Sequence, residues 1–203
     1  MIEYRSLKTK EIVAAGAVLG RAFRDSPGYS AIFSHLVEDR RARTISRVKT
    51  GFTAAAVRQE VADGAWVDGR LAAVALTTAP GQWPRPVCVF VRHARGCALA
   101  GPRAIANLLR ADGYMTKRHP KEPHHYLFVL GVEPDLQGRG LGKGLLTRIS
   151  ARADAERMPC YLETDKERNV RLYESAGYRV VNDEIVPTTP GFRMWTMRRD
   201  AAA

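Results

Sequence analysis

The sequence predicts an α/β protein with a mixed β-sheet flanked by helices, and two patterns support this. Residues 124–181 alternate strand, helix, strand, helix and strand. This order requires a crossover connection and therefore a locally parallel pair of strands. Nearer the N-terminus, two apolar runs flank Asp68-Gly69, a dipeptide that favours the tight turn of an antiparallel hairpin. A sheet with both kinds of pairing is mixed.

The N-terminal part contributes three predicted elements before the hairpin. Residues 2–7 predict a short first strand, and residues 9–24 predict a helix that ends before Ser26-Pro27-Gly28. Residues 30–60 predict a second helical region, because apolar side chains recur there at helical spacing.

The C-terminal part contains the elements that form the alternating pattern. They follow a proline-rich loop from residue 80 and a predicted helix over much of 88–111. In order, they are a strand at 124–132, a helix at 142–157, a strand at 159–164, a helix at 166–176 and a strand pair at 178–181 and 193–197.

A glycine-rich loop follows the strand at 124–132. Gly138, Gly140 and Gly142 occupy alternate positions directly before the helix. Glycines let the backbone turn sharply, so several N–H groups can converge on one anion. The helix that follows adds its unpaired N–H groups and the positive end of its dipole. The pattern predicts a phosphate-binding loop.

The spacing excludes two other phosphate motifs. A P-loop requires Gly, four residues and then Gly-Lys-Ser/Thr, but Gln137 and Gly144 stand where a glycine and a hydroxyl residue belong. The dinucleotide fingerprint Gly-x-Gly-x-x-Gly fails as well, because its last glycine would be Lys143 or Leu145.

A second motif lies about thirty residues further along. It reads Asn169-x-x-x-Tyr173-x-x-x-Gly177-Tyr178 on a predicted helix. Residues four apart share a helix face, so Asn169 and Tyr173 can point into the same cleft.

Together, the strand ending in Val132-x-Pro134, the Gln137-x-x-Gly140-x-Gly142 loop and the second motif resemble the GNAT superfamily of acyl-CoA-dependent N-acyltransferases. Within it, Pro120-Lys-Glu-Pro123 and the final Trp195-x-Met197 are similar to the branch of small-molecule enzymes that includes puromycin N-acetyltransferase. The likeness covers residues 124–199 well and the first half only in layout.

This resemblance implies the GNAT fold, in which the thioester of acetyl-CoA lies between two splayed parallel strands, here 124–132 and 159–164. Acetyl-CoA is the implied co-substrate, and no metal is implied. A backbone N–H near Leu130 to Val132 would hold the thioester oxygen, and Gly131 suits a bulge or close approach of ligand to backbone. The implied cofactor-binding residues are Leu130, Gly131, Val132, Gln137, Gly138, Arg139, Gly140, Leu141, Gly142, Lys143, Asn169 and Tyr173.

The same resemblance suggests catalytic roles. Tyr173 is the expected acid, because a tyrosine stays protonated at neutral pH and can donate to the leaving thiolate. For the base, Glu163 near the end of its strand and His124 at the start of the other strand are both candidates. Candidate acceptor-binding residues are Asp25, Tyr29, Trp83 and Tyr126.

Composition narrows the setting. The net charge is +11, yet the basic residues are spread along the chain without a recognition pattern, so nucleic-acid binding is not expected. No apolar run is long enough to cross a bilayer. Three cysteines without a Cys-x-x-Cys motif suggest a reducing compartment, with the cytoplasm as the default. We expect one domain over residues 1–203, and a homodimer is compatible with the sequence.

The expected reaction is transfer of acetyl from acetyl-CoA to a primary amine on a small molecule. Direct transfer in a ternary complex is expected, since no cysteine lies near either motif to act as nucleophile. Two alternatives remain open: a protein or peptide N-acetyltransferase on the same fold, and a non-catalytic acyl-CoA-binding regulatory module.

Overall fold

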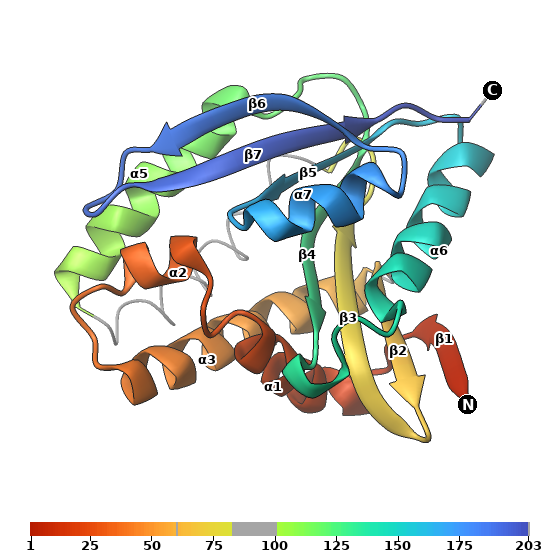
Figure 1. Ribbon diagram of the computed structural model, residues 1–203, viewed down its shortest axis with the longest axis horizontal. Coiled ribbons are helices and arrows are strands. Elements are labelled where there is room, and N and C mark those ends of the chain that lie inside the picture. The colour runs from red at the N-terminus through yellow and green to blue at the C-terminus, as the bar shows by residue number, and fades with distance from the viewer. Residues whose placement is uncertain (60, 83–100, 203) are drawn as a thin grey trace.

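A computed structural model describes residues 1–59, 61–82 and 101–202 of the 203-residue chain. It shows one seven-stranded mixed sheet with helices on both faces (Figure 1). The strands are β1 (Ile2–Ser6), β2 (Ala62–Val67), β3 (Arg70–Thr78), β4 (His125–Val132), β5 (Cys160–Thr164), β6 (Arg179–Val186) and β7 (Phe192–Arg199). The α-helices are α1 (Ile12–Ala22), α2 (Pro27–Ile32), α3 (Glu38–Arg58), α5 (Pro102–Arg118), α6 (Leu141–Ala155) and α7 (Glu167–Glu174). Short 3₁₀ turns lie at Thr9–Glu11 and Pro134–Leu136.

The strand order is β1-β2-β3-β4-β5-β7-β6. The pair β4–β5 is parallel and the other neighbouring pairs are antiparallel, which confirms the predicted mixed sheet. The turn at Asp68-Gly69 has positive φ at both residues, +48° and +80°, as a type I′ turn requires.

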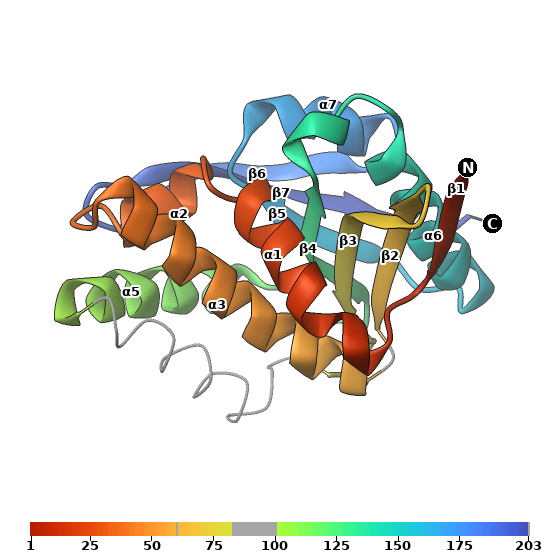
Figure 2. The same cartoon turned by 90° about the horizontal axis from the view of Figure 1, so that it is seen from below.

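The two sheet faces bury separate cores. Along β3, Val74 and Leu76 pack with α1, α3 and α5, whereas Ala73 and Ala75 pack on the other side with α6 and α7. This alternation follows from the two-residue repeat of a strand. Figure 2 shows α1 and α3 on one side of the sheet. The α6–α7 face carries the phosphate-loop helix, and the α1–α3 face carries the elements from the first half of the chain.

The structure corrects the helical region predicted at 30–60. It consists of two helices, α2 and α3, separated by residues 33–37. Ser26 caps α2 by accepting from the Tyr29 N–H at 3.3 Å, and Pro27 stands at its first position. Both features favour a new helix start. The predicted strand pair at the C-terminus is also longer than expected, since β6 and β7 each contain eight residues.

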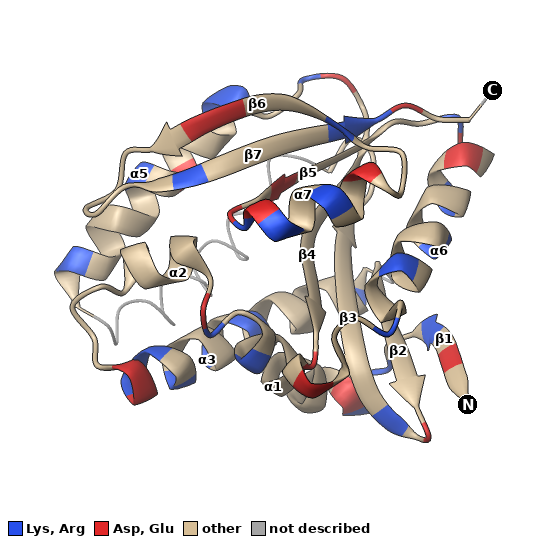
Figure 3. Ribbon diagram, in the orientation of Figure 1, with Lys and Arg blue, Asp and Glu red and all other residues tan. Residues whose placement is uncertain are grey.

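Helix α5 ends at Arg118, seven residues beyond the predicted end at 111. Residues 88–100 of that prediction lie outside the described part of the chain. Lys and Arg side chains are distributed over α1, α3, α5, α6 and β7 and are not concentrated on one element (Figure 3).

Candidate active site

The strands β4 and β5 diverge in the middle of the sheet. Their pairing joins His125, Tyr126 and Leu127 to Cys160, Tyr161 and Leu162. Beyond Leu127, β4 continues to Val132 without pairing to β5. A bulge lies at the same level, because the consecutive residues Leu76 and Thr77 of β3 face Val129 and Leu127 of β4, leaving Phe128 as the extra residue. Backbone groups of β4 beyond Leu127 are therefore not paired to β5.

The structure places the bulge suggested for Gly131 elsewhere. The bulge lies at Phe128, and Gly131 pairs regularly with Val74. A Cβ on Gly131 would lie 2.7 Å from Leu19 Cδ2 and 3.0 Å from Ala22 Cβ. Glycine is therefore required here because α1 packs directly on the strand.

The loop after β4 has the geometry expected of a phosphate-binding loop. Gly138 and Gly140 have φ angles of +79° and +78°, a conformation that L side chains rarely adopt. Gly140 is also the residue before α6, so the first N–H groups of that helix point out of the loop without intrahelical acceptors. These N–H groups and the helix dipole together favour an anion.

A cleft of about 440 Å³ adjoins this loop. Of the residues expected to bind the cofactor, Arg139 is exposed and is not among those that line the cleft. The others do line it: Leu130, Gly131, Val132, Gln137, Gly138, Gly140, Leu141, Gly142, Lys143, Asn169 and Tyr173.

Glu133 anchors the start of the loop, and no local sequence pattern indicates this. Its carboxylate accepts hydrogen bonds from Arg21 Nε at 2.9 Å and from Arg21 Nη2 at 2.5 Å, although Glu133 itself is almost fully buried. Such a two-point contact fixes orientation as well as distance. It holds α1 against the end of β4.

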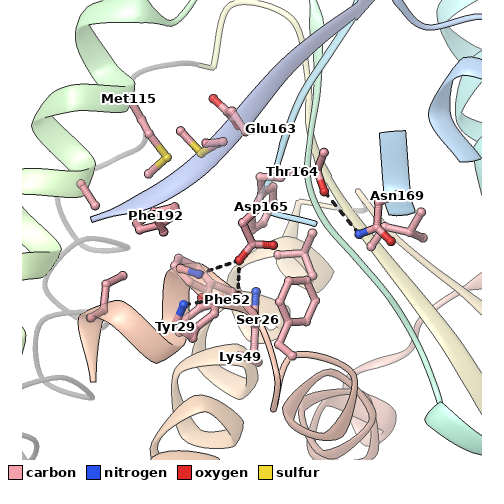
Figure 4. A pocket seen from close by; sticks show the side chains of 18 of the residues that line it. Ser26, Tyr29, Lys49, Phe52, Met115, Glu163, Thr164, Asp165, Asn169 and Phe192 are labelled. Carbon is pink, nitrogen blue, oxygen red and sulfur yellow. Dashed lines mark hydrogen bonds between the residues drawn. The ribbon is translucent and has the colours of Figure 1, made fainter. Parts of the chain in front are cut away.

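A second cavity, of about 200 Å³, lies on the other side of the β4–β5 gap (Figure 4). It combines aromatic walls with charged side chains. The aromatic residues are Phe23, Tyr29, Phe33, Phe52, Tyr126, Phe128, Tyr173 and Phe192. The charged residues are Lys49, Asp112, Glu163 and Asp165.

The cleft and the cavity adjoin each other. Phe23, Leu130, Asp165, Asn169 and Tyr173 line both. A molecule in the cleft and a molecule in the cavity can therefore meet beside Tyr173.

Tyr173 and Asn169 share one face of α7, as their spacing predicts. Tyr173 is buried, and this burial, together with the nearby Asp165 charge, raises the pKa of its hydroxyl above the usual value. It therefore stays protonated at neutral pH. Asn169 Nδ2 donates to Thr164 Oγ1 at 3.3 Å, which ties α7 to the end of β5 (Figure 4).

Asp165 follows β5 directly and was not among the predicted residues. Its carboxylate accepts from the Ser26 hydroxyl and from the Gly28 N–H, the latter at 2.8 Å (Figure 4). These contacts fix the start of α2 to the end of β5. An aspartate in a β–α connection is a common turn residue, so no local signal marked it.

Lys49 was also missed, because a lysine on a helix usually lies at the surface. Here it is 2% exposed, and its Nζ lies 3.6 Å from the Phe23 ring centroid and 4.8 Å from that of Tyr29. Cation–π contacts of this kind stabilise a partly desolvated ammonium. Lys49 therefore brings a positive charge to the cavity wall.

The predicted catalytic and acceptor residues lie in different places. Glu163, Tyr29 and Tyr126 line the cavity. His124 is buried behind it, where desolvation lowers the pKa of its imidazole, and lines a separate small pocket. Asp25 is exposed in the turn between α1 and α2 and does not line the cavity, which corrects its expected placement. Trp83 lies outside the described residues.

His119, at the end of α5, completes the surroundings of Glu163. His119 Nδ1 lies 3.8 Å from Glu163 Oε1, and its Nε2 lies 3.0 Å from Nε2 of His124. Sequence reasoning placed this residue in a loop and assigned it no function.

Comparison with known proteins agrees with this architecture. The pattern of the acetyltransferase (GNAT) family matches residues 61–178, and the chain belongs to this family. This family uses acetyl-CoA as the acetyl donor.

Individual relatives are more distant. A mycothiol acetyltransferase of Propionibacterium freudenreichii is 36% identical over 66 residues, which cover 31% of this chain and 21% of the relative. The chain thus aligns with only about a fifth of that protein. Polyamine N-acetyltransferase of Drosophila melanogaster shares the fold, with a TM-score of 0.69, 18% identity and coverage of 98% and 100% of the two chains. PaiA N-acetyltransferase of Thermoplasma acidophilum, solved with coenzyme A, also shares the fold. Its TM-score is 0.60 and its identity 13%, with coverage of 98% of this chain and 99% of that chain.

Two further observations concern the described residues only. They contain no group of three or more His, Cys, Asp or Glu side chains placed to hold a metal ion. None of their helices has the length and apolar character needed to span a membrane.

Proposed function

We propose that this acetyltransferase transfers the acetyl group of acetyl-CoA to a primary amine of a small molecule, by direct transfer in a ternary complex. The observation that carries the proposal is the junction of the phosphate-loop cleft with an aromatic and acidic cavity at Tyr173 and Asn169. One site suits the donor and the other suits an amine, and the two meet at a protonated hydroxyl.

On the donor side, the pyrophosphate of acetyl-CoA would bind the N–H groups between Gly138 and Lys143. The pantetheine arm would follow β4 beyond Leu127, where the strand is not paired to β5. A backbone N–H in this stretch would then hold the thioester oxygen. One such oxyanion donor is typically worth about 10²–10³ in rate.

On the acceptor side, the cavity favours a small amine with an apolar body. Its aromatic walls bind apolar surface, and its carboxylates attract a cationic group. A volume of about 200 Å³ is small compared with common ligand pockets of roughly 300–1,000 Å³. The polyamine N-acetyltransferase that shares this fold forms N-acetylagmatine, which is also an acetylated small amine.

The acceptor nitrogen must be neutral to attack. For an amine with a pKa of about 10.4, only about 1 in 2,500 molecules is neutral at pH 7, a cost of roughly 4.6 kcal/mol. Glu163 lines the cavity and its side chain is only 7% exposed. It would take the proton from the amine, and Tyr173 would give its proton to the sulfur as the thiolate leaves.

Direct transfer is favoured over an acetyl-cysteine intermediate at the one cysteine among the described residues. This residue, Cys160 on β5, is fully buried, and burial raises the pKa of its thiol. It lines neither the cleft nor the cavity. A buried, protonated thiol is a poor nucleophile.

The test is a thiol-release assay over a panel of amines, run alongside calorimetric titration of acetyl-CoA into the same protein. Micromolar binding with thiol release on a small amine is the expected result. Thiol release with peptides but with no small amine would show that the acceptor is a polypeptide. Binding without turnover on any amine would favour a non-catalytic acyl-CoA-binding module.

A further inference from the structure

Three buried side chains form a row that begins at Glu163 and leads away from the acceptor cavity. It runs from Glu163 on β5 to His119 at the end of α5 and on to His124 at the start of β4. Glu163 lines the acceptor cavity, and His124 lines the small pocket on the other side. The proposed reaction does not explain why two buried histidines stand behind its base.

The hydrogen bonds fix the tautomers of the two imidazoles. His124 Nδ1 lies 2.7 Å from the Glu122 carbonyl oxygen. A carbonyl only accepts, so His124 Nδ1 carries a proton. The pKa of His124 is lowered by desolvation, so at neutral pH its other nitrogen, Nε2, carries none. His119 Nε2, 3.0 Å from it, must therefore be the donor.

This assignment determines what faces Glu163. In a neutral His119 with its proton on Nε2, the Nδ1 nitrogen has a lone pair directed at Glu163 Oε1, 3.8 Å away. Within the described part of the chain, that buried oxygen accepts no hydrogen bond. Two acceptors that face each other in a buried site are stabilised by one proton between them. Separations of this length commonly shorten when substrate binds.

The surroundings would stabilise the positive charge that His119 gains when it takes the proton. Its N–H bonds the Met115 carbonyl, so the ring lies at the C-terminal end of α5, where the helix dipole stabilises a cation. Tyr126 and Tyr161 pack edge-on against the His119 ring, with distances of 4.7 and 5.0 Å between ring centroids. Burial raises the pKa of the Tyr161 hydroxyl, so this group stays neutral. The Glu122 carboxylate is paired with Arg198, and Arg118, the residue before His119, is paired with Glu184.

We propose that His119 is the second proton acceptor of the reaction, and that Glu163 and His119 act as one unit whose tautomer is set by His124. The amine N–H bond breaks as Glu163 takes the proton. The proton then passes to His119 Nδ1, which regenerates the carboxylate beside an imidazolium. The second amine proton leaves the nitrogen as the C–S bond breaks, and it replaces the proton that Tyr173 gives to the sulfur. The imidazolium returns its proton to solvent after the product leaves.

This inference rests on the proposed function, since it needs an acceptor amine, but it also makes a claim that holds without substrate. Nitrogen-15 NMR of the imidazoles in the protein alone should show His124 with its proton on Nδ1 and neutral His119 with its proton on Nε2. A His119 tautomer protonated on Nδ1, or a His124 tautomer protonated on Nε2, would overturn the proposal whatever the acceptor is.

Kinetics supply the second test once an acceptor is known. His119→Gln keeps a donor towards His124 but removes the nitrogen that faces Glu163. It should lower kcat about tenfold or more, leave the KM for acetyl-CoA unchanged and move the acidic limb of the pH profile. In a Glu163→Gln background, His119→Gln should have little further effect, because residues that act as one unit are not additive.

The neighbouring His125 supplies a matched control. It is equally buried, but its Nε2 contacts Glu156 at 3.0 Å on the α6 side. His125→Gln should leave the pH profile unchanged. Multiplicative effects of the Glu163 and His119 substitutions, or a wild-type pH profile in a folded His119→Gln that binds acetyl-CoA normally, would contradict the proposed unit.

Discussion

The cofactor cleft and the acceptor cavity lie side by side but are built in different ways. The cleft comes largely from one continuous segment, β4 to α7, and its main binding groups are backbone N–H groups at Gly138–Lys143 and along β4. The cavity takes side chains from the turn after α1 and from α2, α3, α5, β4, β5, α7 and β7, which are far apart in the sequence. A backbone site depends on local conformation, whereas a side-chain site depends on how distant elements pack.

The two regions meet at Tyr173, so the largest effect is expected there. Tyr173→Phe removes the hydroxyl that would protonate the leaving thiolate, and it should lower kcat about 100-fold. The Kd of acetyl-CoA should stay within about twofold of wild type, because the ring and the phosphate loop are unchanged. Thiol-release assays measure kcat, and calorimetry measures the Kd. A variant with wild-type kcat would remove Tyr173 from the chemistry.

A substitution in the phosphate loop tests whether the cleft is a backbone site. Gly140→Val places a branched side chain at φ +78°, a conformation that costs about 1–2 kcal/mol for an L residue. The N–H groups should turn away from the pyrophosphate, and the Kd of acetyl-CoA should rise about tenfold.

The matched control for this variant is Gly113→Ala in α5. Its Cβ would meet open space, and its φ is not positive. It should leave the Kd unchanged and raise the free energy of unfolding by about 0.5–1 kcal/mol. Equal Kd values for Gly140→Val and wild type would show that the loop does not hold the cofactor.

A pair of substitutions tests whether the cavity is a side-chain site. Tyr29→Ala removes part of the aromatic wall and should raise the KM for the acceptor about tenfold, with the KM for acetyl-CoA unchanged. Asp25→Ala, four residues earlier, changes an exposed side chain outside the cavity and should alter neither KM. If Asp25→Ala raises the acceptor KM instead, the cavity described here is not where the amine binds.

The smallest expected effect concerns stability and the buried His124. Its pKa is lowered in the folded protein, mainly by desolvation, so the unfolded chain binds this proton more readily. Stability should therefore fall as the pH drops below about 6.5, the pKa of an exposed histidine. Urea denaturation between pH 7.5 and 5.5 should show this loss. The loss should be smaller in His124→Gln, and an identical pH dependence would contradict the burial argument.

The contrast between the regions also explains what the sequence could reveal. The segment from β4 to α7 was predictable because glycine spacing, helical periodicity and the Asn169–Tyr173 interval are local signals. The observed strands and helices there begin and end within about two residues of the prediction. Glu133 is an exception, since its buried carboxylate lies beside Arg21 and Arg70, which are far away in the sequence.

The acceptor side could not be read in this way. Lys49, His119 and Asp165 belong to ordinary helix or turn sequences, and each gains its position from a partner on a distant element. The boundary between α2 and α3 was missed because apolar periodicity continues through it. The close packing of α1 on Gly131 was not predicted, because the sequence does not show that the helix meets the strand at that point.

The most direct test of the central claim is a crystal structure with coenzyme A bound. We expect the pyrophosphate at the N–H groups of Gly138–Lys143 and the pantetheine arm along β4 beyond Leu127. The sulfur should lie within hydrogen-bonding distance of the Tyr173 hydroxyl and face the cavity that Glu163 lines. A sulfur directed away from Tyr173, or a pyrophosphate bound elsewhere, would contradict the account that the two sites meet at Tyr173.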